Sequence, residues 1–265
     1  MKLKINNQAI EVKGIKTDSR EVKSGELFIA YKGVNVDGHN YIDQAIEKGA
    51  TVIVGEKSEQ EISNLSKHTN IKYVQVKDGR EMWSELESQR QGYPQKKLKI
   101  IGVTGTDGKT TTANFIYEIL KNAGRRVGIL STVSAKFGDV DISTGLHVTS
   151  PDPDFLFETL KKMVDTGVEY LVLEVTSHAL IHKRVHGLEF VASCITNISP
   201  EHLDAHGDYL KLISDKAKIV GMSKCVFLNS EGVGFDEVKE ETKKYGNSEI
   251  IPISASELEE LGSLG

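Results

Sequence analysis

The chain has 265 residues, of which 38% are hydrophobic and 27% are charged, and its formal net charge is −5. This length accommodates two domains, and the composition is that of an ordinary soluble globular protein. The charge balance gives no general reason to expect nucleic-acid binding, and no apolar run is long enough to span a bilayer. Because residues 1–4 are not followed by the apolar core of a signal peptide, we expect a cytoplasmic protein without nucleic-acid or membrane partners.

The first 91 residues alternate short strands and helices, which predicts a small α/β domain. Residues 2–5 and 9–12 alternate around Asn6-Asn7, a strong signal for a β-hairpin. Further strands are expected at residues 25–30, 51–54 and 73–76, and helices at residues 41–48 and 78–91. Residues 91–97 contain Gly, Pro and two lysines and break the periodicity. We therefore place the domain boundary here, giving domains 1–97 and 98–265.

Beyond the boundary the pattern becomes a repeated alternation of strands and helices. Amphipathic helices are expected from residue 110 to 124 and over residues 154–166. Continuous apolar runs, typical of strands covered on both faces, lie at residues 127–130, 170–175, 191–198 and 225–228. The sequence predicts a mainly parallel sheet with helices on both faces and ligands at the strand carboxyl ends. Residues 231–265 are acidic and show no clear last strand.

A phosphate-binding loop is predicted between residues 99 and 112. A β-branched apolar run enters a loop with glycines at positions 102, 105 and 108, and Lys109-Thr110 opens a helix. Glycine allows a close approach of the backbone to phosphate, and the helix N-terminus favours an anion. Lys109 would reach the terminal phosphates of a nucleoside triphosphate, and the Thr110 hydroxyl would bind Mg²⁺. The acidic side chain of Asp107 is expected to point away from the phosphates.

Polar clusters follow three of the predicted strands or helices. Glu174, at the end of a buried strand, would hold Mg²⁺ directly or through water, while a helix-capping role stays open for it and for Thr176. Residues 196–207 contain two His and two acidic residues, which suits a metal or phosphate site without selecting zinc. Spacing alone assigns Lys216 to the solvated face of a helix that begins at Asp208. The only cysteines, Cys194 and Cys225, have no metal-ligand spacing and are interpreted as buried free thiols.

Taken in order, these stretches resemble the Mur ligases, most closely the MurE type, which act on a UDP-N-acetylmuramoyl-dipeptide in peptidoglycan synthesis. The resemblance lies in residues 17–20, 25–28 and 37–42 for the uridine-nucleotide domain, 105–112 for the ATP loop, and 147–151, 174–184 and 196–207 for later motifs. Two positions depart from the family pattern. Thr149-Ser150-Pro151 replaces the usual Thr-Thr-Pro, and Asp107 stands where Asn is commoner.

The resemblance implies an ATP-dependent ligase that adds a third amino acid to UDP-MurNAc-L-Ala-D-Glu through an acyl phosphate. It implies ATP and Mg²⁺ as cofactors, with Lys109, His202 and Lys216 as catalytic residues, and Lys216 carries a CO2-derived carbamate. The implied metal ligands are Thr110, Glu174, His202 and the Lys216 carbamate. The implied ATP-binding residues are Gly105, Thr106, Asp107, Gly108, Lys109, Thr110 and Thr111. The UDP-precursor would be bound by Ser19, Thr149, Ser150, Ser177 and Arg184, with Arg184 pairing with a substrate carboxylate.

Members of this family continue into a third domain that binds the incoming amino acid, and this chain ends before such a domain. We therefore expect residues 1–97 to bind the UDP-precursor and residues 98–265 to form an incomplete ATP-binding central domain, without turnover on their own. Two other functions stay open. One is a non-catalytic module that binds a nucleotide or UDP-sugar, and the other is a different Mur ligase or a folylpolyglutamate-type ligase, which shares the ATP domain.

Overall fold

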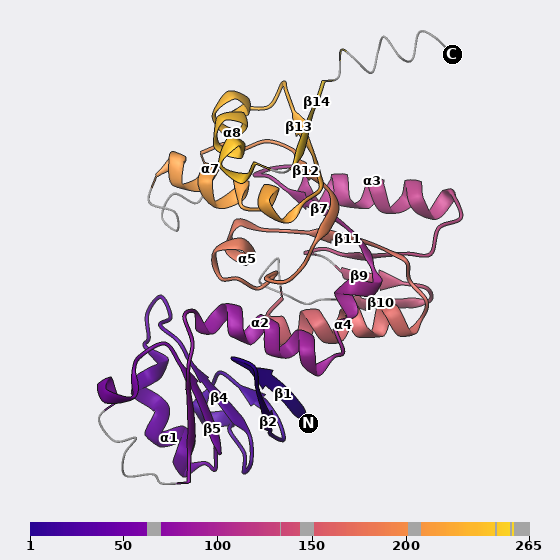
Figure 1. Cartoon of the computed structure of the whole chain (residues 1–265). Helices are drawn as coiled ribbons and strands as arrows, with labels where there is room; N and C mark the ends of the chain where they lie inside the picture. Colours follow the sequence, from indigo (N-terminus) through magenta and orange to yellow (C-terminus); the bar gives the residue numbers. More distant parts are fainter. Residues whose placement is uncertain are drawn as a thin grey trace. The chain divides into compact units, whose positions relative to one another are not determined.

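In the computed structural model the chain divides into two units, Met1–Tyr93 and Pro94–Gly265 (Figure 1). The structure describes residues 1–62, 70–132, 134–143, 151–200, 208–246, 248–254 and 256. The division falls inside the Gly- and Pro-containing segment at which the sequence periodicity breaks. No helix in these described ranges combines the length and the apolar character needed to cross a bilayer.

The first unit is built on a four-stranded parallel sheet with the order β3-β4-β5-β6. Its elements are the hairpin strands β1 (Lys2–Ile5) and β2 (Gln8–Glu11), the sheet strands β3 (Ile15–Lys16), β4 (Leu27–Ala30), β5 (Val52–Gly55) and β6 (Lys72–Gln75), the helices α1 (Ile42–Glu47) and α2 (Gly79–Arg90), and the 3₁₀ turns η1 (Ser19–Glu21), η2 (Gly38–Tyr41) and η3 (Glu59–Glu61). Asn6 and Asn7 have φ of 47° and 63°, as a tight hairpin turn requires. The expected hairpin, three strands and two helices are therefore confirmed with small shifts at their ends.

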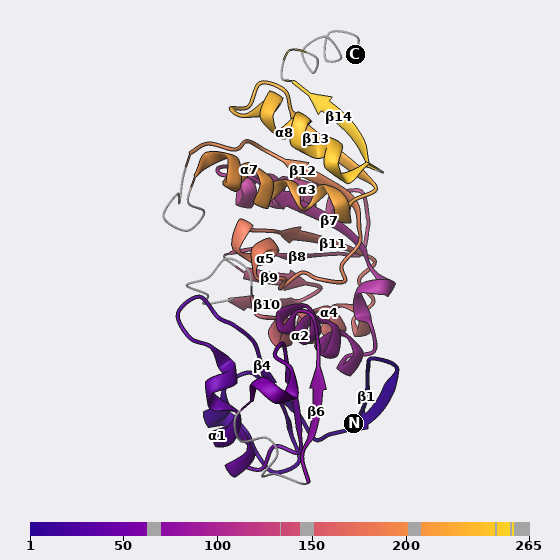
Figure 2. The same cartoon turned by 60° about the vertical axis from the view of Figure 1, so that its left-hand side comes forward.

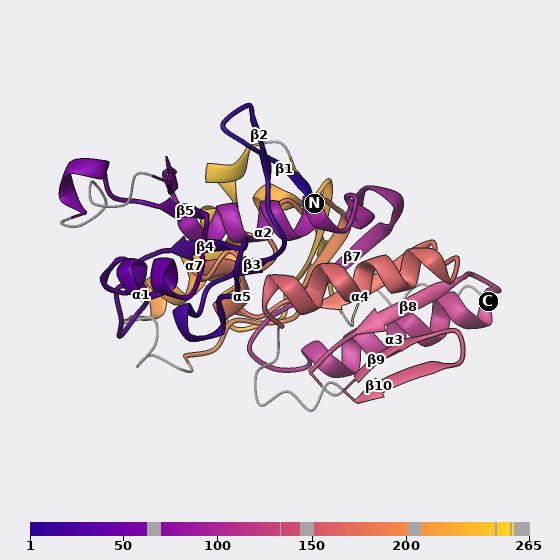
Figure 3. The same cartoon turned by 90° about the horizontal axis from the view of Figure 1, so that it is seen from below.

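Alternate residues of this sheet enter two separate cores. Leu27 and Ile29 of β4 face a cluster that contains the hairpin and Leu86 of α2, whereas Phe28 faces a cluster that contains Ile42 of α1. Figure 3 shows the hairpin and α2 on one side of the sheet and α1 on the other. Loops that contain polar residues follow the carboxyl ends of β4, β5 and β6.

The second unit is an eight-stranded sheet with the order β10-β9-β8-β11-β7-β12-β13-β14 (Figure 2). Its strands are β7 (Lys99–Thr104), β8 (Val127–Leu130), β9 (Ser134–Phe137), β10 (Val140–Ser143), β11 (Tyr170–Glu174), β12 (Phe190–Ile195), β13 (Cys225–Asn229) and β14 (Glu249–Ile253). Its helices are α3 (Lys109–Asn122), α4 (Pro153–Asp165), α5 (Ser177–Ile181), α7 (Tyr209–Ala217) and α8 (Phe235–Thr242), with 3₁₀ turns η5 (Pro94–Lys97), η6 (Val220–Met222) and η7 (Lys243–Tyr245). The pairs β10–β9 and β9–β8 are antiparallel and the other pairs of this sheet are parallel, so the predicted mainly parallel sheet is confirmed.

Helices cover both faces of this sheet, as predicted. Leu171 and Leu173 of β11 enter a core with residues of α4, α5, α7 and α8, whereas Val172 enters a core with Ala113 and Tyr117 of α3. The alternation explains why these strands read as continuous apolar runs, since each face of the sheet has its own helical cover. α3 follows β7 directly, which brings its N-terminus to the carboxyl edge of the sheet.

Two expectations need correction. The expectation that residues 231–265 show no clear last strand is wrong, because β14 pairs with β13 in parallel register. Its sequence contains Pro252 and is only half-buried or exposed, so it lacks the apolar run of a central strand. Cys194 and Cys225 are free thiols, but both are half-buried rather than fully buried. Burial raises the pKa of Cys194 to about 11, which makes it an unreactive thiol.

Candidate functional site

The loop between β7 and α3 has the backbone geometry of a phosphate cradle. Gly105 has a φ of 149°, and a Cβ added there would lie 1.9 Å from Thr196 Oγ1. Gly108, the N-cap of α3, has a φ of 76°, and a Cβ there would meet nothing within 4 Å. The first amides of a helix have no intrahelical acceptor, so the N–H groups of Lys109, Thr110 and Thr111 can bind an anion in this open space.

A second segment, residues 196–199 after β12, braces this loop. The Asp107 amide donates to Asn197 Oδ1 at 3.0 Å, and Thr196 Oγ1 donates to the Asp107 carbonyl at 2.6 Å. Thr106 donates its amide to the Asn197 carbonyl and accepts at its hydroxyl from the Ser199 amide, both at 2.9 Å. Sequence reasoning assigned this segment to a metal or phosphate site. The two His and two acidic residues behind that prediction lie outside the described residues. The described residues 196–199 fix the loop conformation, and the Asp107 side chain is exposed.

Thr110 and Glu174 lie together, as a magnesium site at this position requires. Thr110 Oγ1 lies 3.1 Å and 3.0 Å from the two Glu174 oxygens, and the Thr132 amide donates to Glu174 Oε2 at 3.0 Å. Glu174 is only 2% exposed. Mg²⁺ prefers oxygen ligands and is usually bound by one or two protein oxygens together with phosphates and water, which this pair fits. Among the described residues, no group of three or more His, Cys, Asp and Glu side chains could hold a metal ion.

The two lysines of the prediction both contact the loop backbone. Lys109 Nζ donates to the Thr106 carbonyl at 2.6 Å, so its ammonium is folded onto its own loop. Lys216 of α7 is 5% exposed, and its Nζ donates to the Gly105 carbonyl at 2.5 Å. The assignment of Lys216 to a solvated face, made from spacing alone, is therefore wrong. Burying a lysine ammonium costs free energy of folding unless hydrogen bonds or a chemical change compensate it. The burial of Lys216 against the phosphate-binding loop therefore makes it a candidate functional residue.

Ser177 is the first residue of the short helix α5, which follows β11, and Arg184 lies just beyond the end of this helix. Thr176 caps this helix by accepting from the Ala179 amide at 3.2 Å, so the capping alternative holds for Thr176. Arg184 Nε lies 3.0 Å from Asp152 Oδ1. Burial raises the pKa of Asp152, and the nearby Arg184 opposes that rise. A substrate carboxylate that pairs with Arg184 would therefore compete with Asp152.

Three predicted site residues, Thr149, Ser150 and His202, lie outside the described residues. Ser19 lies in the first unit at a cavity of about 500 Å³. Its hydroxyl donates to Gln44 Oε1 at 2.5 Å, and it is 5% exposed. Beside it, the hydrogen bonds from Arg20 lower the pKa of Asp18 to about 2. The cavity walls include Arg20, Tyr31, Gly33, Val36 and Tyr41. It combines aromatic rings, hydroxyls and a guanidinium, groups that suit a nucleotide.

The bracing of the loop predicts a strong effect of a methyl group at Gly105. Gly105→Ala should lower the free energy of unfolding by about 2 kcal/mol, because the Cβ overlaps Thr196 Oγ1 and the φ is unfavourable for alanine. Gly108→Ala is the matched control and should lower the free energy of unfolding by about 1 kcal/mol. Its positive φ is unfavourable for alanine, but the added Cβ would contact no other atom within 4 Å. Urea unfolding measures both. Recovery of part of the loss in Gly105→Ala/Thr196→Ala is also expected, and equal losses at the two glycines would contradict the brace.

Two protein-family models together match most of the chain. A family model described as Mur ligase middle domain matches residues 103–261, and one described as Mur ligase family, catalytic domain matches residues 11–91. The chain is 41% identical over 208 residues to the UDP-N-acetylmuramoyl-L-alanyl-D-glutamate--2,6-diaminopimelate ligase of Bacteroides fragilis, covering 77% of this chain and 41% of that protein. The chain thus spans about four tenths of the length of the curated relatives it matches.

Two solved structures show the same fold. One, of a UDP-N-acetylmuramoyl-L-alanyl-D-glutamate--2,6-diaminopimelate ligase, has a TM-score of 0.75 and 22% identity and covers 96% of this chain and 53% of that one. The other, a Mycobacterium tuberculosis folylpolyglutamate synthase complexed with ADP, has a TM-score of 0.54 and 16% identity. It covers 65% of this chain and 46% of that one. Similarity to the synthase is therefore confined to a smaller part of the chain.

Proposed function

Because the chain belongs to the Mur ligase family, we propose that it forms the nucleotide-binding part of an ATP-dependent ligase of peptidoglycan synthesis. The proposed ligase adds a third amino acid to UDP-MurNAc-L-Ala-D-Glu. The observation that carries the proposal is the pairing of Thr110 with Glu174 at the entrance to α3, with Lys216 buried against the same loop. The names of the curated relatives support this substrate class.

The proposed reaction brings two anions together, so positive charge must dominate the site. A carboxylate of the precursor attacks the γ-phosphorus of ATP, ADP leaves, and the amine of the amino acid then displaces phosphate to form the amide. Mg²⁺ would supply charge neutralisation at the phosphates. Residues 105–111 would hold ATP through backbone amides, and Lys109 would exchange the Thr106 carbonyl for the terminal phosphates.

The other site residues have proposed roles that follow the family resemblance. Thr110 and Glu174 would hold Mg²⁺, and His202 would assist a second metal ion. Lys216, as a carbamate, would offer two oxygens beside the loop in place of the ammonium that contacts Gly105. The precursor would contact Ser19 in the first unit and Thr149, Ser150, Ser177 and Arg184 in the second. We propose residues 1–97 as the precursor domain and residues 98–265 as the ATP domain.

A folylpolyglutamate-type ligase is the second candidate, because such a synthase shares the fold over 65% of this chain. The match of residues 11–91 to a Mur ligase domain favours the Mur ligase function, since the first unit would otherwise have no role. A non-catalytic nucleotide-binding module is the third candidate. It could use the Thr110–Glu174 pair to bind ATP with Mg²⁺, but it would need no buried Lys216.

The test joins this chain to the remaining C-terminal part of the Bacteroides fragilis relative, whose unaltered enzyme is the positive control. We expect phosphate release that requires ATP, Mg²⁺, UDP-MurNAc-L-Ala-D-Glu and one amino acid of a panel. The matched control omits the precursor. ATP and UDP titrations of the chain alone accompany the assay. Binding of both nucleotides without substrate-dependent release in the joined protein would favour the binding module, and release with a folate acceptor alone would favour the synthase.

A further inference from the structure

A small hairpin, residues 31–38, forms one wall of the Ser19 cavity. It follows β4 and leads into η2, and it is closed by hydrogen bonds from the Gly33 amide to the Val36 carbonyl at 2.8 Å and from the Gly38 amide to the Tyr31 carbonyl at 2.9 Å. Gly33 and Val36 line the cavity, while Val34 is 79% exposed. A hairpin of this size is marginal by itself, so its position depends on what holds it from outside.

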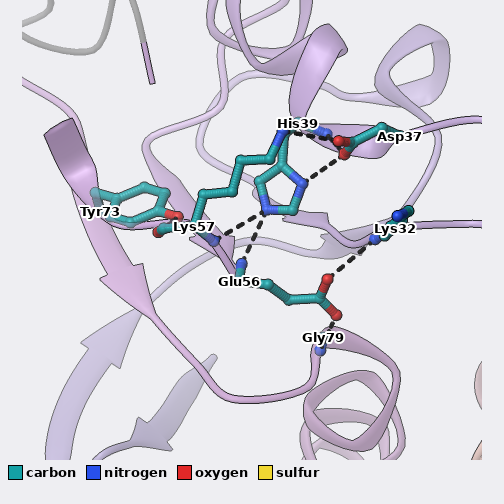
Figure 4. Close-up of polar contacts among 7 residues, drawn as sticks. All are labelled: Lys32, Asp37, His39, Glu56, Lys57, Tyr73 and Gly79. Atoms are coloured by element: carbon teal, nitrogen blue, oxygen red, sulfur yellow. Dashed lines mark hydrogen bonds and ion pairs between the residues drawn. The ribbon is translucent and has the colours of Figure 1, made fainter. Parts of the chain in front are cut away.

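Glu56, the residue after β5, joins this hairpin to two other segments. Its Oε2 accepts from the Lys32 amide at 3.1 Å, and its Oε1 accepts from the Gly79 amide, the first residue of α2, at 2.8 Å. Its own amide donates to His39 Nε2 at 2.9 Å. Figure 4 shows the Glu56 carboxylate between Lys32 and Gly79, and the His39 ring above its backbone. One residue therefore contacts both sides of the loop that follows β4.

His39 completes the connection on the far side of the hairpin. It is 8% exposed, and because its Nε2 accepts from the Glu56 amide, its Nδ1 carries the hydrogen and donates to Asp37 Oδ1 at 2.6 Å. Lys57 Nζ donates to Asp37 Oδ2 at 2.7 Å. Burial opposes ionisation of Asp37, but donation by Lys57 and His39 outweighs it and keeps the pKa of this carboxyl below its usual value. We call Asp37, His39, Glu56 and Lys57 the Glu56 clamp.

We propose that Glu56 and His39 are positioning residues that set the affinity of the Ser19 cavity for a uridine nucleotide by fixing the hairpin that walls it. The clamp residues follow the carboxyl ends of β4 and β5, where a parallel sheet gathers its ligand-binding loops. Neither residue lines this cavity, so both act through the hairpin. The inference rests on the proposed function for its ligand, whereas the clamp itself can be tested without a ligand.

The first experiment compares Glu56→Gln with the unaltered 265-residue chain. A glutamine keeps one acceptor oxygen but presents an NH2 group to the other amide, so in either orientation it cannot accept from Lys32 and Gly79 together, and the hairpin loses its link to α2. We expect the Kd for UDP to rise about tenfold and the hairpin amides of Lys32, Gly33 and Gly38 to exchange faster. ATP affinity at the second unit should stay unchanged. Glu59→Gln, an exposed glutamate in the following turn, is the matched control and should change neither quantity.

The second experiment separates the two nitrogens of His39. His39→Gln keeps an acceptor near the Nε2 position for the Glu56 amide, and His39→Asn keeps a donor near the Nδ1 position for Asp37. Because the proposal assigns the position of the hairpin to the Glu56 link, the Asn variant should weaken UDP binding more than the Gln variant. Thermal unfolding checks that both variants fold.

The outcomes distinguish the clamp from the proposed function. Unchanged UDP affinity in Glu56→Gln, despite faster exchange of the hairpin amides, would overturn the positioning role, as would the opposite order of the two His39 variants. If the unmodified chain does not bind UDP, the nucleotide function of the cavity fails. Hydrogen exchange then still decides whether Glu56 holds the hairpin, since protection retained in Glu56→Gln would refute the clamp.

Discussion

Glu174→Gln is expected to remove the contribution of Mg²⁺ to ATP binding while leaving metal-free binding nearly unchanged. The variant keeps the size of the side chain and one acceptor for Thr110, but it loses the negative charge that would face the cation. With Mg²⁺ present, the Kd for ATP should rise by roughly 100-fold. With EDTA in place of Mg²⁺, the change should stay within about threefold, because removing a carboxylate also removes repulsion of the phosphates.

The control for this prediction is Glu169→Gln, which changes an exposed carboxylate just before the other end of the same strand, β11. It should alter ATP binding in neither buffer. Glu174 also accepts from the Thr132 amide, so a purely structural role must be tested too. Equal losses of affinity with and without Mg²⁺, together with a lower free energy of unfolding, would make Glu174 a structural acceptor and not a metal ligand.

Lys216→Ala is expected to reduce turnover of the joined ligase by about 10³-fold, the scale on which a preorganised charge at a reacting group acts. Nucleotide binding should change far less, because the backbone amides proposed to hold ATP remain in place when the contact of Lys216 with the Gly105 carbonyl is removed. If the functional group is a carbamate, added acetate should restore part of the activity, since it supplies the missing oxygens. Turnover of the joined ligase with an unaltered Lys216 should then also depend on dissolved CO2. Incorporation of ¹³C from labelled bicarbonate into this ligase would detect the carbamate itself.

The alternative for Lys216 is that its ammonium acts directly by holding Gly105. In that case methylamine, not acetate, should restore activity to Lys216→Ala, and Lys216→Arg should retain it. Lys211→Ala, on the same helix with half its side chain exposed, is the matched control and should turn over normally. Activity of Lys216→Ala equal to that of this control would remove Lys216 from the catalytic residues.

The sequence predicted the parts of the site that follow from strand order. Thr110 and Glu174 are 64 positions apart, yet Glu174 lies at the carboxyl end of one predicted parallel strand and Thr110 opens the helix that follows another, which is why their meeting could be anticipated. The burial of Lys216 could not be, because helix periodicity shows which side chains share a face but not which loop packs against it. For the same reason the brace by Thr196 and Asn197 was missed, since its bonds go mainly to backbone atoms of a distant segment.

The first unit shows a similar limit. Its strands and helices followed from local patterns, and the segment 37–42 could be matched to a family motif. The link from Glu56 to His39 had no such signal, because a lone glutamate after a strand is usually a solvated residue. Only the parallel register of β4 and β5 brings the two segments together.

Pro252 has a consequence for how copies of this protein behave in solution. β14 is the last strand in the described sheet order, and it bonds to its neighbour through the Glu249 amide and the Ile253 carbonyl. Since successive residues of a strand alternate in direction, the nitrogen of Pro252 faces away from β13, on a side where none of the described strands pairs and where it offers no donor. A strand from another molecule would meet a gap in the hydrogen-bonding row at this position. Pro252, which breaks the apolar pattern of β14, is therefore also expected to disfavour pairing of this strand with a strand of another molecule.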